Sequence, residues 1–331
     1  MGEFERRVLR LVSDGKLTAE EAEELLQAQR EHRPLRDLRE MIEGGLSDVR
    51  TRVRDVTEER EEEIAAGELE GEGPVELDFQ GAMGFTVQSG ESGRYRVVWR
   101  TGRTFFGDGP DRPTVHVEGR RIRIEAPVRG SGPIAFPFTG ASVNLYLPAD
   151  SVLRGEVAEQ NGRVETVGLA IDKLLLETQN ARIRVDAPRL GQLSVVSRNG
   201  SIDVAAEVGE SVRVDAWNGR VSVRGAVRDV FAMTRNGRIE AQIGPVKGGH
   251  CQLRTLNGAV ELRLPAGVAA SISAETVHGA IMADVPGLRL AEDVRDLARR
   301  RLRGNVDGAQ GDIAAELETT NGAVRIVQAS R

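Results

Sequence analysis

The sequence predicts a mainly β protein, a single-stranded β-solenoid with coils of about 19–21 residues, preceded by an α-helical N-terminal module. Three observations lead to this fold. The dipeptide Asn-Gly recurs at a nearly constant interval in the second half of the chain. Apolar and polar residues alternate on both sides of each Asn-Gly, as in half-buried strands. The first 66 residues instead carry apolar residues at helical spacing.

Residues 1–33 are predicted to form a helical hairpin. The apolar pattern that begins at Phe4 is interrupted at residues 13–15 (Ser-Asp-Gly), and Thr18 with Glu21 forms a capping box for a second helix. A hairpin of this size is too small to bury a core of its own. We therefore expect it to dock on another surface or to self-associate.

Residues 34–66 are predicted to form a long amphipathic helix, and residues 67–74 a Gly- and Glu-rich linker. The apolar residues of the helix follow spacings of 4, 3, 4 and 3, which is a coiled-coil seam. This candidate association face consists of Ile42, Leu46, Val49, Val53 and Val56. Two occupants remain open: the chain's own second domain, or a second copy or another protein.

Residues 75–331 are predicted to form the solenoid. From Asn161 the marker positions follow at steps of 19, 19, 19, 18, 21, 21 and 43 residues, the last being about two repeats. A fixed period near 20 residues indicates one structural unit per repeat, stacked on the next. The corner positions are Asn161, Asn180, Asn199, Asn218, Asn236, Asn257, His278 and Asn321.

Strand alternation fixes which side chains face the core of each coil. The residues expected inside are Val212, Val214, Val221 and Val223, and one coil earlier Leu193, Val195, Ile202 and Val204. The residues expected outside are Arg213, Asp215, Ser222 and Arg224. The stacked asparagines are expected to form an amide ladder, with glycine supplying the positive φ of the corner. The alternative is a sandwich or propeller of hairpins, in which each Asn-Gly is a type I′ turn.

Two regions are less regular. Residues 75–150 lack Asn-Gly and are interpreted as the opening coils, with an exposed loop at 102–113. Residues 288–303 interrupt the last repeats, and their thin apolar stripe (Val294, Leu297 and Leu302) indicates a helical or loop excursion.

The sequence shows no cluster of residues typical of a catalytic site or a metal site. The net charge of −6 gives no attraction to nucleic acid or anionic lipid. The outward positions hold no column of Asp and no paired carboxylates. His250 and Cys251 are neighbours in a strand, so they point to opposite sides and cannot readily share a metal, and Cys251 is expected as a small buried residue. We expect a non-enzyme with no catalytic residue, no metal ion and no cofactor.

The chain begins without an apolar signal region, and no stretch approaches the roughly 18 apolar residues of a membrane span. It contains one cysteine, so no internal disulfide is possible. We therefore expect a cytoplasmic protein that reaches the membrane only through a partner.

Several segments carry a resemblance to known families. VNLYLPADSVLRGEVAEQNGRV (143–164), the Asn-Gly repeats and GDIAAELETTNGAVRIV (311–327) resemble the Toastrack (DUF4097) family, and RRVLRLVSDGKLTAEEAEELL (6–26) resembles the SHOCT-like module. The resemblance implies a right-handed β-solenoid similar to LiaX-type and YvlB-type proteins of the bacterial envelope stress response. Such proteins are scaffolds or sensors, and the family defines no catalytic residues.

Two function hypotheses follow. The first is a regulatory scaffold whose helical head associates and whose solenoid presents a binding face, with protein partners that include a membrane-associated stress-response protein and a second copy of the chain. The second is a structural polymer similar to bactofilins, because open solenoid ends expose unpaired strand edges that favour stacking. A carbohydrate-binding or hydrolysing solenoid needs an aromatic or acidic groove, for which Trp99 and Trp217 are the only tryptophans.

Overall fold

A computed structural model describes residues 60–90, 93–101, 112–126, 141–296, 299–308 and 312–329. All regular structure in these residues is β-strand, and the predicted β-solenoid is confirmed. The helical hairpin at 1–33, the association face (Ile42 to Val56) and most of the loop at 102–113 lie outside the described residues. The chain divides into two compact units, and the solenoid belongs to the larger one.

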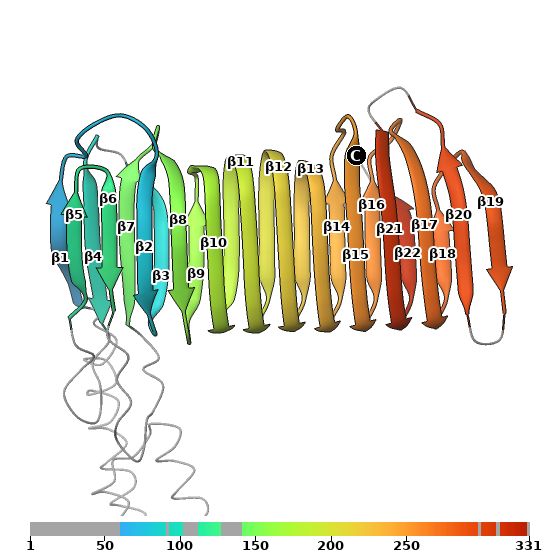
Figure 1. The fold of residues 1–331 in the computed structure, drawn as a ribbon, viewed down its shortest axis with the longest axis horizontal. Helices are drawn as coiled ribbons and strands as arrows, with labels where there is room; N and C mark the ends of the chain where they lie inside the picture. Colours follow the sequence, from blue (N-terminus) through green and yellow to red (C-terminus); the bar gives the residue numbers. More distant parts are fainter. Residues whose placement is uncertain are drawn as a thin grey trace, which may run out of the picture. The chain divides into compact units, whose positions relative to one another are not determined.

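The strands are numbered in chain order (Figure 1). They are β1 (Arg60–Gly67), β2 (Val75–Gly81), β3 (Gly84–Gly90), β4 (Tyr95–Thr101), β5 (Thr114–Glu118), β6 (Arg121–Glu125), β7 (Ser142–Pro148), β8 (Val152–Glu159), β9 (Arg163–Val167), β10 (Ala170–Asn180), β11 (Arg182–Asn199), β12 (Ile202–Asn218), β13 (Val221–Asn236), β14 (Ile239–Ile243), β15 (Gly249–Asn257), β16 (Val260–Leu264), β17 (Ala269–His278), β18 (Ile281–Asp284), β19 (Leu288–Arg295), β20 (Arg300–Val306), β21 (Asp312–Asn321) and β22 (Val324–Gln328).

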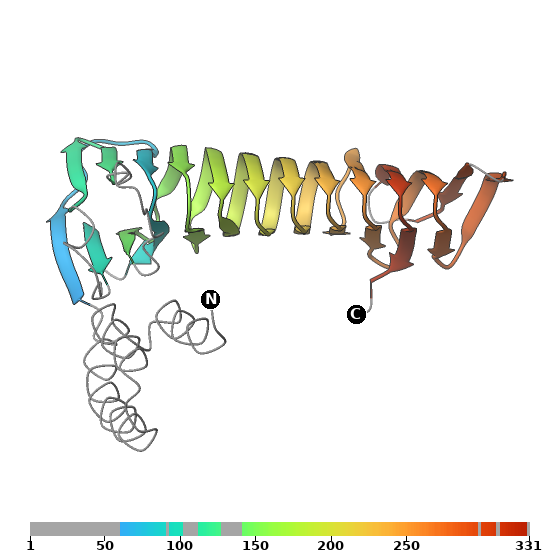
Figure 2. The ribbon, with the colours of Figure 1, turned by 90° about the horizontal axis from the view of Figure 1, so that it is seen from below.

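Each central coil runs along one layer, bends, and returns along a second layer to its asparagine. The segments that follow each Asn-Gly form layer A, and the segments that lead into each asparagine form layer B (Figure 2). Successive coils pair in parallel, so that Val195 lies opposite Val214 and Asn199 opposite Asn218. A hairpin would pair the strands around each Asn-Gly antiparallel, so the alternative of a sandwich or propeller of hairpins is wrong.

The core between the two layers is aliphatic. The inward positions predicted for two successive coils are confirmed, since all eight side chains are buried. Outward, Arg213, Asp215 and Arg224 are exposed as predicted, but Ser222 is buried. Ser222 lies in register between Asp203 and Glu240, and its short side chain is covered where a longer one would reach solvent.

The coils at both ends of the stack are out of chain order (Figure 1). The last coil, β21 and β22, lies between β15/β16 and β17/β18 and pairs with both in parallel. At the other end, β2 lies between β6 and β8, and β3 lies between β7 and β9. The first and last coils therefore have neighbours on both sides, and their backbone groups are satisfied along both edges.

Two predicted elements are corrected. Residues 60–66, predicted as the end of the long helix, belong to strand β1, which pairs with β4. Residues 288–303, predicted as a helix or loop, instead form most of the antiparallel hairpin of β19 and β20, which pairs antiparallel with β17. In both places a neighbouring strand offers unpaired backbone groups, and pairing with that edge outweighs a weak helical pattern.

Candidate binding face

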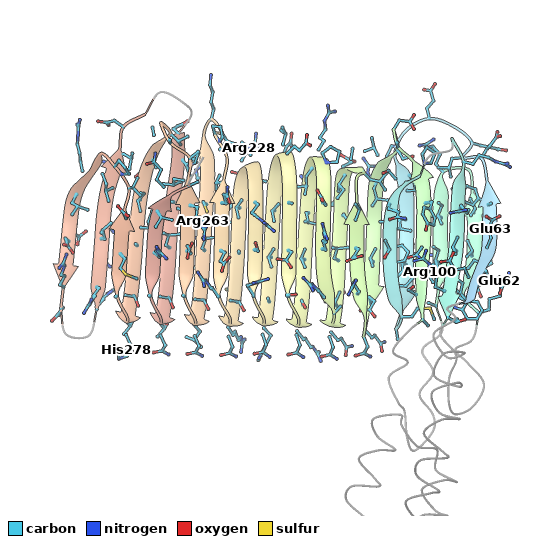
Figure 3. The ribbon with its side chains drawn as sticks, turned by 180° about the vertical axis from the view of Figure 1, so that it is seen from behind. Glu62, Glu63, Arg100, Arg228, Arg263 and His278 are labelled. Atoms are coloured by element: carbon cyan, nitrogen blue, oxygen red, sulfur yellow. The ribbon has the colours of Figure 1, made fainter. Side chains whose placement is uncertain are left out.

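The predicted corner residues form a hydrogen-bonded row along one edge of the solenoid. Each asparagine Nδ2 donates to Oδ1 of the asparagine one coil before it, and all six donor–acceptor distances are 2.8 Å. The row runs through Asn161, Asn180, Asn199, Asn218, Asn236, Asn257 and Asn321. His278 lies on the same edge beyond Asn321, in register with it (Figure 3). The amides satisfy one another, so this row stabilises the stack.

A glycine follows every ladder asparagine except Asn180, which precedes Ala181, and close backbone contact requires it. Gly219 has φ of +143°, and a Cβ added there would lie 1.7 Å from the carbonyl oxygen of Gly200. Gly200 and Gly258 have the same geometry toward the coils before them. The Asn-Gly repeat thus encodes both the side-chain ladder and the close approach of successive corners.

A column of buried side chains lies two residues before the asparagines, and most of them carry a hydroxyl group, Ala216 being one exception. Thr178 Oγ1 donates to Ser197 Oγ at 3.0 Å, and Thr255 Oγ1 donates to the Gly237 carbonyl at 3.1 Å. In the first coil of the ladder, Glu159 takes the place of the hydroxyl residue and pairs in register with Thr178. This replacement is visible in the sequence, although the sequence reasoning did not single it out.

Glu159 is a buried carboxyl group with no charged partner among the described residues. Its side chain is 2% exposed, and neither oxygen has a hydrogen bond of good geometry among the described residues. Burial raises its pKa to about 7, and the nearby Asn161 amide offsets this only in part. Near neutral pH the group therefore lies at the midpoint of its titration.

The outer side of layer A is covered by paired charges. Arg238 contacts Glu240 at 2.8 Å and Glu261 at 2.5 Å, and Arg263 contacts Glu261 at 2.7 Å. Burial raises the pKa of Glu261, but the hydrogen bonds from Arg263 and Arg238 outweigh it, and the pKa lies below its usual value. Arg263 faces the viewer in Figure 3. These side chains satisfy one another within the chain.

The outer side of layer B differs in composition. Val196, Trp217, Met233 and Leu256 are each 45–49% exposed, and the guanidinium of Arg235 lies 3.5 Å from the centre of the Trp217 ring. The arginines around them, Arg198, Arg213 and Arg235, form no ion pair with any described residue. We call this surface the Trp217 face, formed by Val196, Arg198, Arg213, Trp217, Met233, Arg235 and Leu256.

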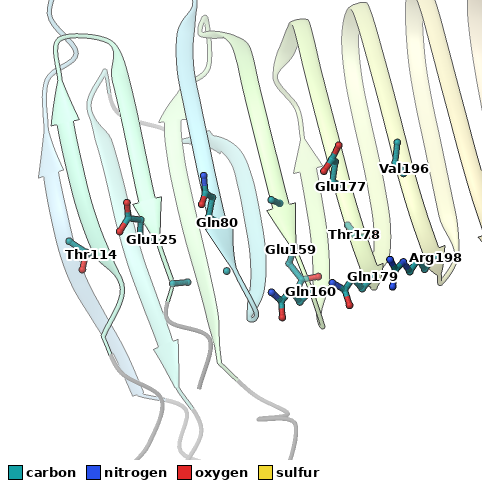
Figure 4. A pocket seen from close by; sticks show the side chains of 13 residues that line it. Gln80, Thr114, Glu125, Glu159, Gln160, Glu177, Thr178, Gln179, Val196 and Arg198 are labelled. Carbon is teal, nitrogen blue, oxygen red and sulfur yellow. The ribbon is translucent and has the colours of Figure 1, made fainter. Parts of the chain in front are cut away.

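A groove of about 680 Å³ adjoins the Trp217 face and shares Val196 and Arg198 with it (Figure 4). Small residues lie at its base, because successive strands carry Gly81, Ala126 and Ala158 there. Its other lining residues include Gln80, Glu125, Glu177 and Gln179. The groove is thus acidic and amide-rich where the Trp217 face is basic and apolar. Glu159 also lines it.

The residues considered for metal or redox chemistry are structural. Cys251 is buried, as predicted, and burial raises the pKa of its thiol to about 12. His250 is on the opposite side of the strand, with Nδ1 3.4 Å from Oδ1 of Asp229. In the described part of the chain, no group of three or more His, Cys, Asp or Glu side chains is placed to hold a metal ion. Nor do the described residues include a helix long and apolar enough to cross a membrane.

The family comparison concerns the N-terminal segment. Residues 3–32 match the SHOCT-like domain, which confirms the resemblance of that segment. No curated protein matches the chain.

Solved structures that match most of the chain share little sequence with it. A "putative cell adhesion protein" from Clostridium sporogenes is 13% identical, with 82% of this chain and 100% of that chain covered and a TM-score of 0.29. A "putative adhesin" from Bacteroides fragilis is 9% identical, with 82% and 98% covered and a TM-score of 0.37. A "putative lipid binding protein" from Parabacteroides distasonis is 11% identical, with 83% and 98% covered and a TM-score of 0.32.

Proposed function

We propose that this chain is a non-enzymatic scaffold that holds a protein partner on the Trp217 face. The observation that carries the proposal is the composition of the Trp217 face itself, since ion pairs occur on both layers, for example Arg238–Glu261 on layer A and Arg254–Glu318 on layer B. The arginines Arg182, Arg220, Arg238 and Arg263 on layer A are paired with carboxylates, whereas the Trp217 face leaves apolar side chains half-exposed beside unpaired arginines. Trp, Met and Arg are enriched at the centres of protein interfaces.

The rigidity of the solenoid suits this role. The stacked coils share one aliphatic core and the asparagine ladder, so side chains in successive coils keep fixed distances from one another. When a partner contacts several coils, little conformational entropy is lost on the solenoid side of the interface, because the coils already hold this surface in place.

The cellular role is part of the same proposal. The resemblance to Toastrack proteins supports a function in the envelope stress response, on the cytoplasmic side, with a membrane-associated partner. The SHOCT-like segment and the seam from Ile42 to Val56 would serve for association with that partner or with a second copy of the chain.

The test is recovery of partners by the tagged full chain from cells under envelope stress. The triple variant Trp217→Ser/Met233→Ser/Leu256→Ser removes the apolar part of the face, and Arg224→Glu on layer A serves as the control. We expect the wild-type chain and the control to recover the same proteins and the triple variant to lose them. Identical recovery by the folded triple variant would overturn the proposal.

A 70–331 truncation addresses the helical head separately. If the truncated chain keeps the partners but changes its oligomeric state, the head serves self-association rather than recruitment. If it loses the partners as well, recruitment depends on the head.

A further inference from the structure

We propose that the Trp217 face binds an extended acidic peptide segment that also carries aliphatic side chains. This inference rests on the proposed scaffold function and names the chemistry of the partner. Its basis is the charge, spacing and surroundings of three arginines on the outer side of layer B.

The charge of the face is unbalanced within the chain. Arg198, Arg213 and Arg235 have no ion-pair partner among the described residues, although the whole chain has a net charge of −6. Asp215 is the one acidic residue between them, in register with Val196 and Met233. An arginine guanidinium binds a carboxylate through two parallel hydrogen bonds, so an acidic ligand complements this face.

The spacing of the face favours an extended segment that crosses the strands. Arg198, Trp217 and Arg235 each precede a ladder asparagine, in three successive coils. With strands about 4.8 Å apart, the Cα atoms of Arg198 and Arg235 lie roughly 10 Å from each other. In a polyproline II segment, side chains three residues apart lie on one side at about 9 Å. Acidic residues at positions i and i+3 thus match the two arginines.

The surroundings of the arginines account for the aliphatic part of the ligand. Val196 and Met233 lie in the same column on either side of Asp215, and Trp217 presents half of its surface beside them. Aliphatic side chains between the acidic ones would cover these residues and remove apolar surface from water.

The adjoining groove favours a peptide over an anionic membrane or polysaccharide. Glu125 and Glu177 line the groove next to Arg198, and a broad anionic surface would meet these carboxylates as well as the arginines. A narrow segment can engage the arginines alone, or pass into the groove with neutral residues that hydrogen-bond to Gln80 and Gln179.

The test uses fluorescein-labelled peptides and fluorescence anisotropy with the full chain. The probe is (Glu-Pro-Leu)4, and the matched peptides are (Gln-Pro-Leu)4 and (Lys-Pro-Leu)4. We expect saturable binding of the Glu peptide that weakens as salt is raised, and at least tenfold weaker binding of the other two.

Protein variants locate the site. Arg198→Glu/Arg235→Glu should weaken binding at least tenfold, and Trp217→Ala several-fold. Arg224→Glu should leave it unchanged, because Arg224 is an exposed arginine that lies on layer A between Ala205 and Gln242. Thermal melting of each variant verifies that the solenoid is intact.

Two outcomes would overturn the inference: binding of the Lys peptide as tight as that of the Glu peptide, or Glu-peptide binding that the double arginine variant does not weaken. Preferential binding of heparin or phosphatidylglycerol vesicles at these arginines would also overturn it, but would leave the Trp217 face as a binding surface. The scaffold proposal itself fails only if the triple variant recovers every partner.

Discussion

At the corner of most coils, one asparagine and one glycine perform two separate tasks. The asparagine joins neighbouring coils through its side-chain amide, and the glycine allows their backbones to approach. A polar residue that recurs at an edge can be mistaken for a binding site, but here its hydrogen-bonding groups face one another. The functional candidates are residues that break the repeat: Glu159 in the hydroxyl column and Trp217 on the outer face.

Replacing a ladder asparagine should have a modest, position-dependent effect. Asn218 donates to Asn199 and accepts from Asn236, so Asn218→Ala removes two hydrogen bonds and should lower the free energy of unfolding by roughly 1–2 kcal/mol. Asn161 only accepts, from Asn180, so Asn161→Ala should cost about half as much. Equilibrium unfolding in urea measures both, and equal losses would contradict the ladder's contribution.

Glu159 is expected to make stability depend on pH. Its pKa in the folded chain is about 7, against an ordinary value of 4.5. Between these pH values the unfolded chain releases the proton while the folded chain keeps it, so the free energy of unfolding falls as pH rises. Above about pH 7 the folded chain ionises too, and the loss levels off.

The variant Glu159→Gln should remove this part of the pH dependence. Because the adjoining groove admits water near the carboxyl group, we expect the variant to gain roughly 1–2 kcal/mol over wild type between pH 5 and pH 8. Melting temperatures at the two pH values measure this change, with Glu177→Gln, an exposed carboxylate of the next coil, as the control. A wild-type pH profile in Glu159→Gln would show that Glu159 does not titrate in this range.

At the scale of the strand, alternation alone decides which side chains enter the core. Val, Ile and Leu repeat at the inward positions of successive coils, where each side chain packs on its equivalents above and below. The exposed positions tolerate Arg, Asp, Trp or Met, since each is in contact with solvent. The strand pattern therefore fixes the core and leaves the outer faces free to carry function.

The contrast between adjacent residues of β13 tests this rule. Val223→Asp places an unpaired carboxylate in the aliphatic core and should unfold the solenoid. Arg224→Asp, one residue further along on the exposed side, should change the free energy of unfolding by less than about 0.5 kcal/mol. Circular dichroism and thermal melting distinguish the two, and retention of native β content by Val223→Asp would refute the assigned facing.

The misassigned elements lie where local pattern and strand pairing compete. The helical stripe over 288–303 rests on three apolar residues, of which Val294 is exposed and Leu302 is buried. Strand β20 of this segment pairs antiparallel with β17 on one side and with β19 on the other, so its backbone groups have partners along both edges. Strand β1 likewise pairs with a neighbouring strand, β4. A weak amphipathic pattern does not reveal that an open strand edge lies nearby in space.

At the scale of the whole solenoid, layer B is finished at both ends by antiparallel strands, whereas layer A ends beyond β22 with the parallel strand β18. The hairpin of β5 and β6 lies at one end of layer B, and the hairpin of β20 and β19 lies at the other. A parallel coil of a second molecule cannot continue the stack across such a hairpin in the register of the central coils. This arrangement disfavours the bactofilin-like polymer, although the outer edge of β19 remains a strand edge.

We therefore expect discrete particles rather than filaments. Negative-stain electron microscopy of the purified full chain, over a range of concentrations and salt, should show isolated particles, and analytical ultracentrifugation should show a defined mass. Filaments with a constant axial repeat would instead support the polymer hypothesis and identify end-to-end stacking as the function of the coils.

The sequence by itself determined the repeat, the inward residues and the corner asparagines, because each depends on local spacing that every coil shares. The order in which the coils stack is defined only by the tertiary structure. The repeat period of the sequence predicts that the units stack, but not which units become neighbours. The tertiary structure also decided that Asn321 follows Asn257, and that Glu159 is buried with no charged partner among the described residues. The Trp217 face likewise exists only in the folded chain, because its residues come from four coils and meet only when those coils stack.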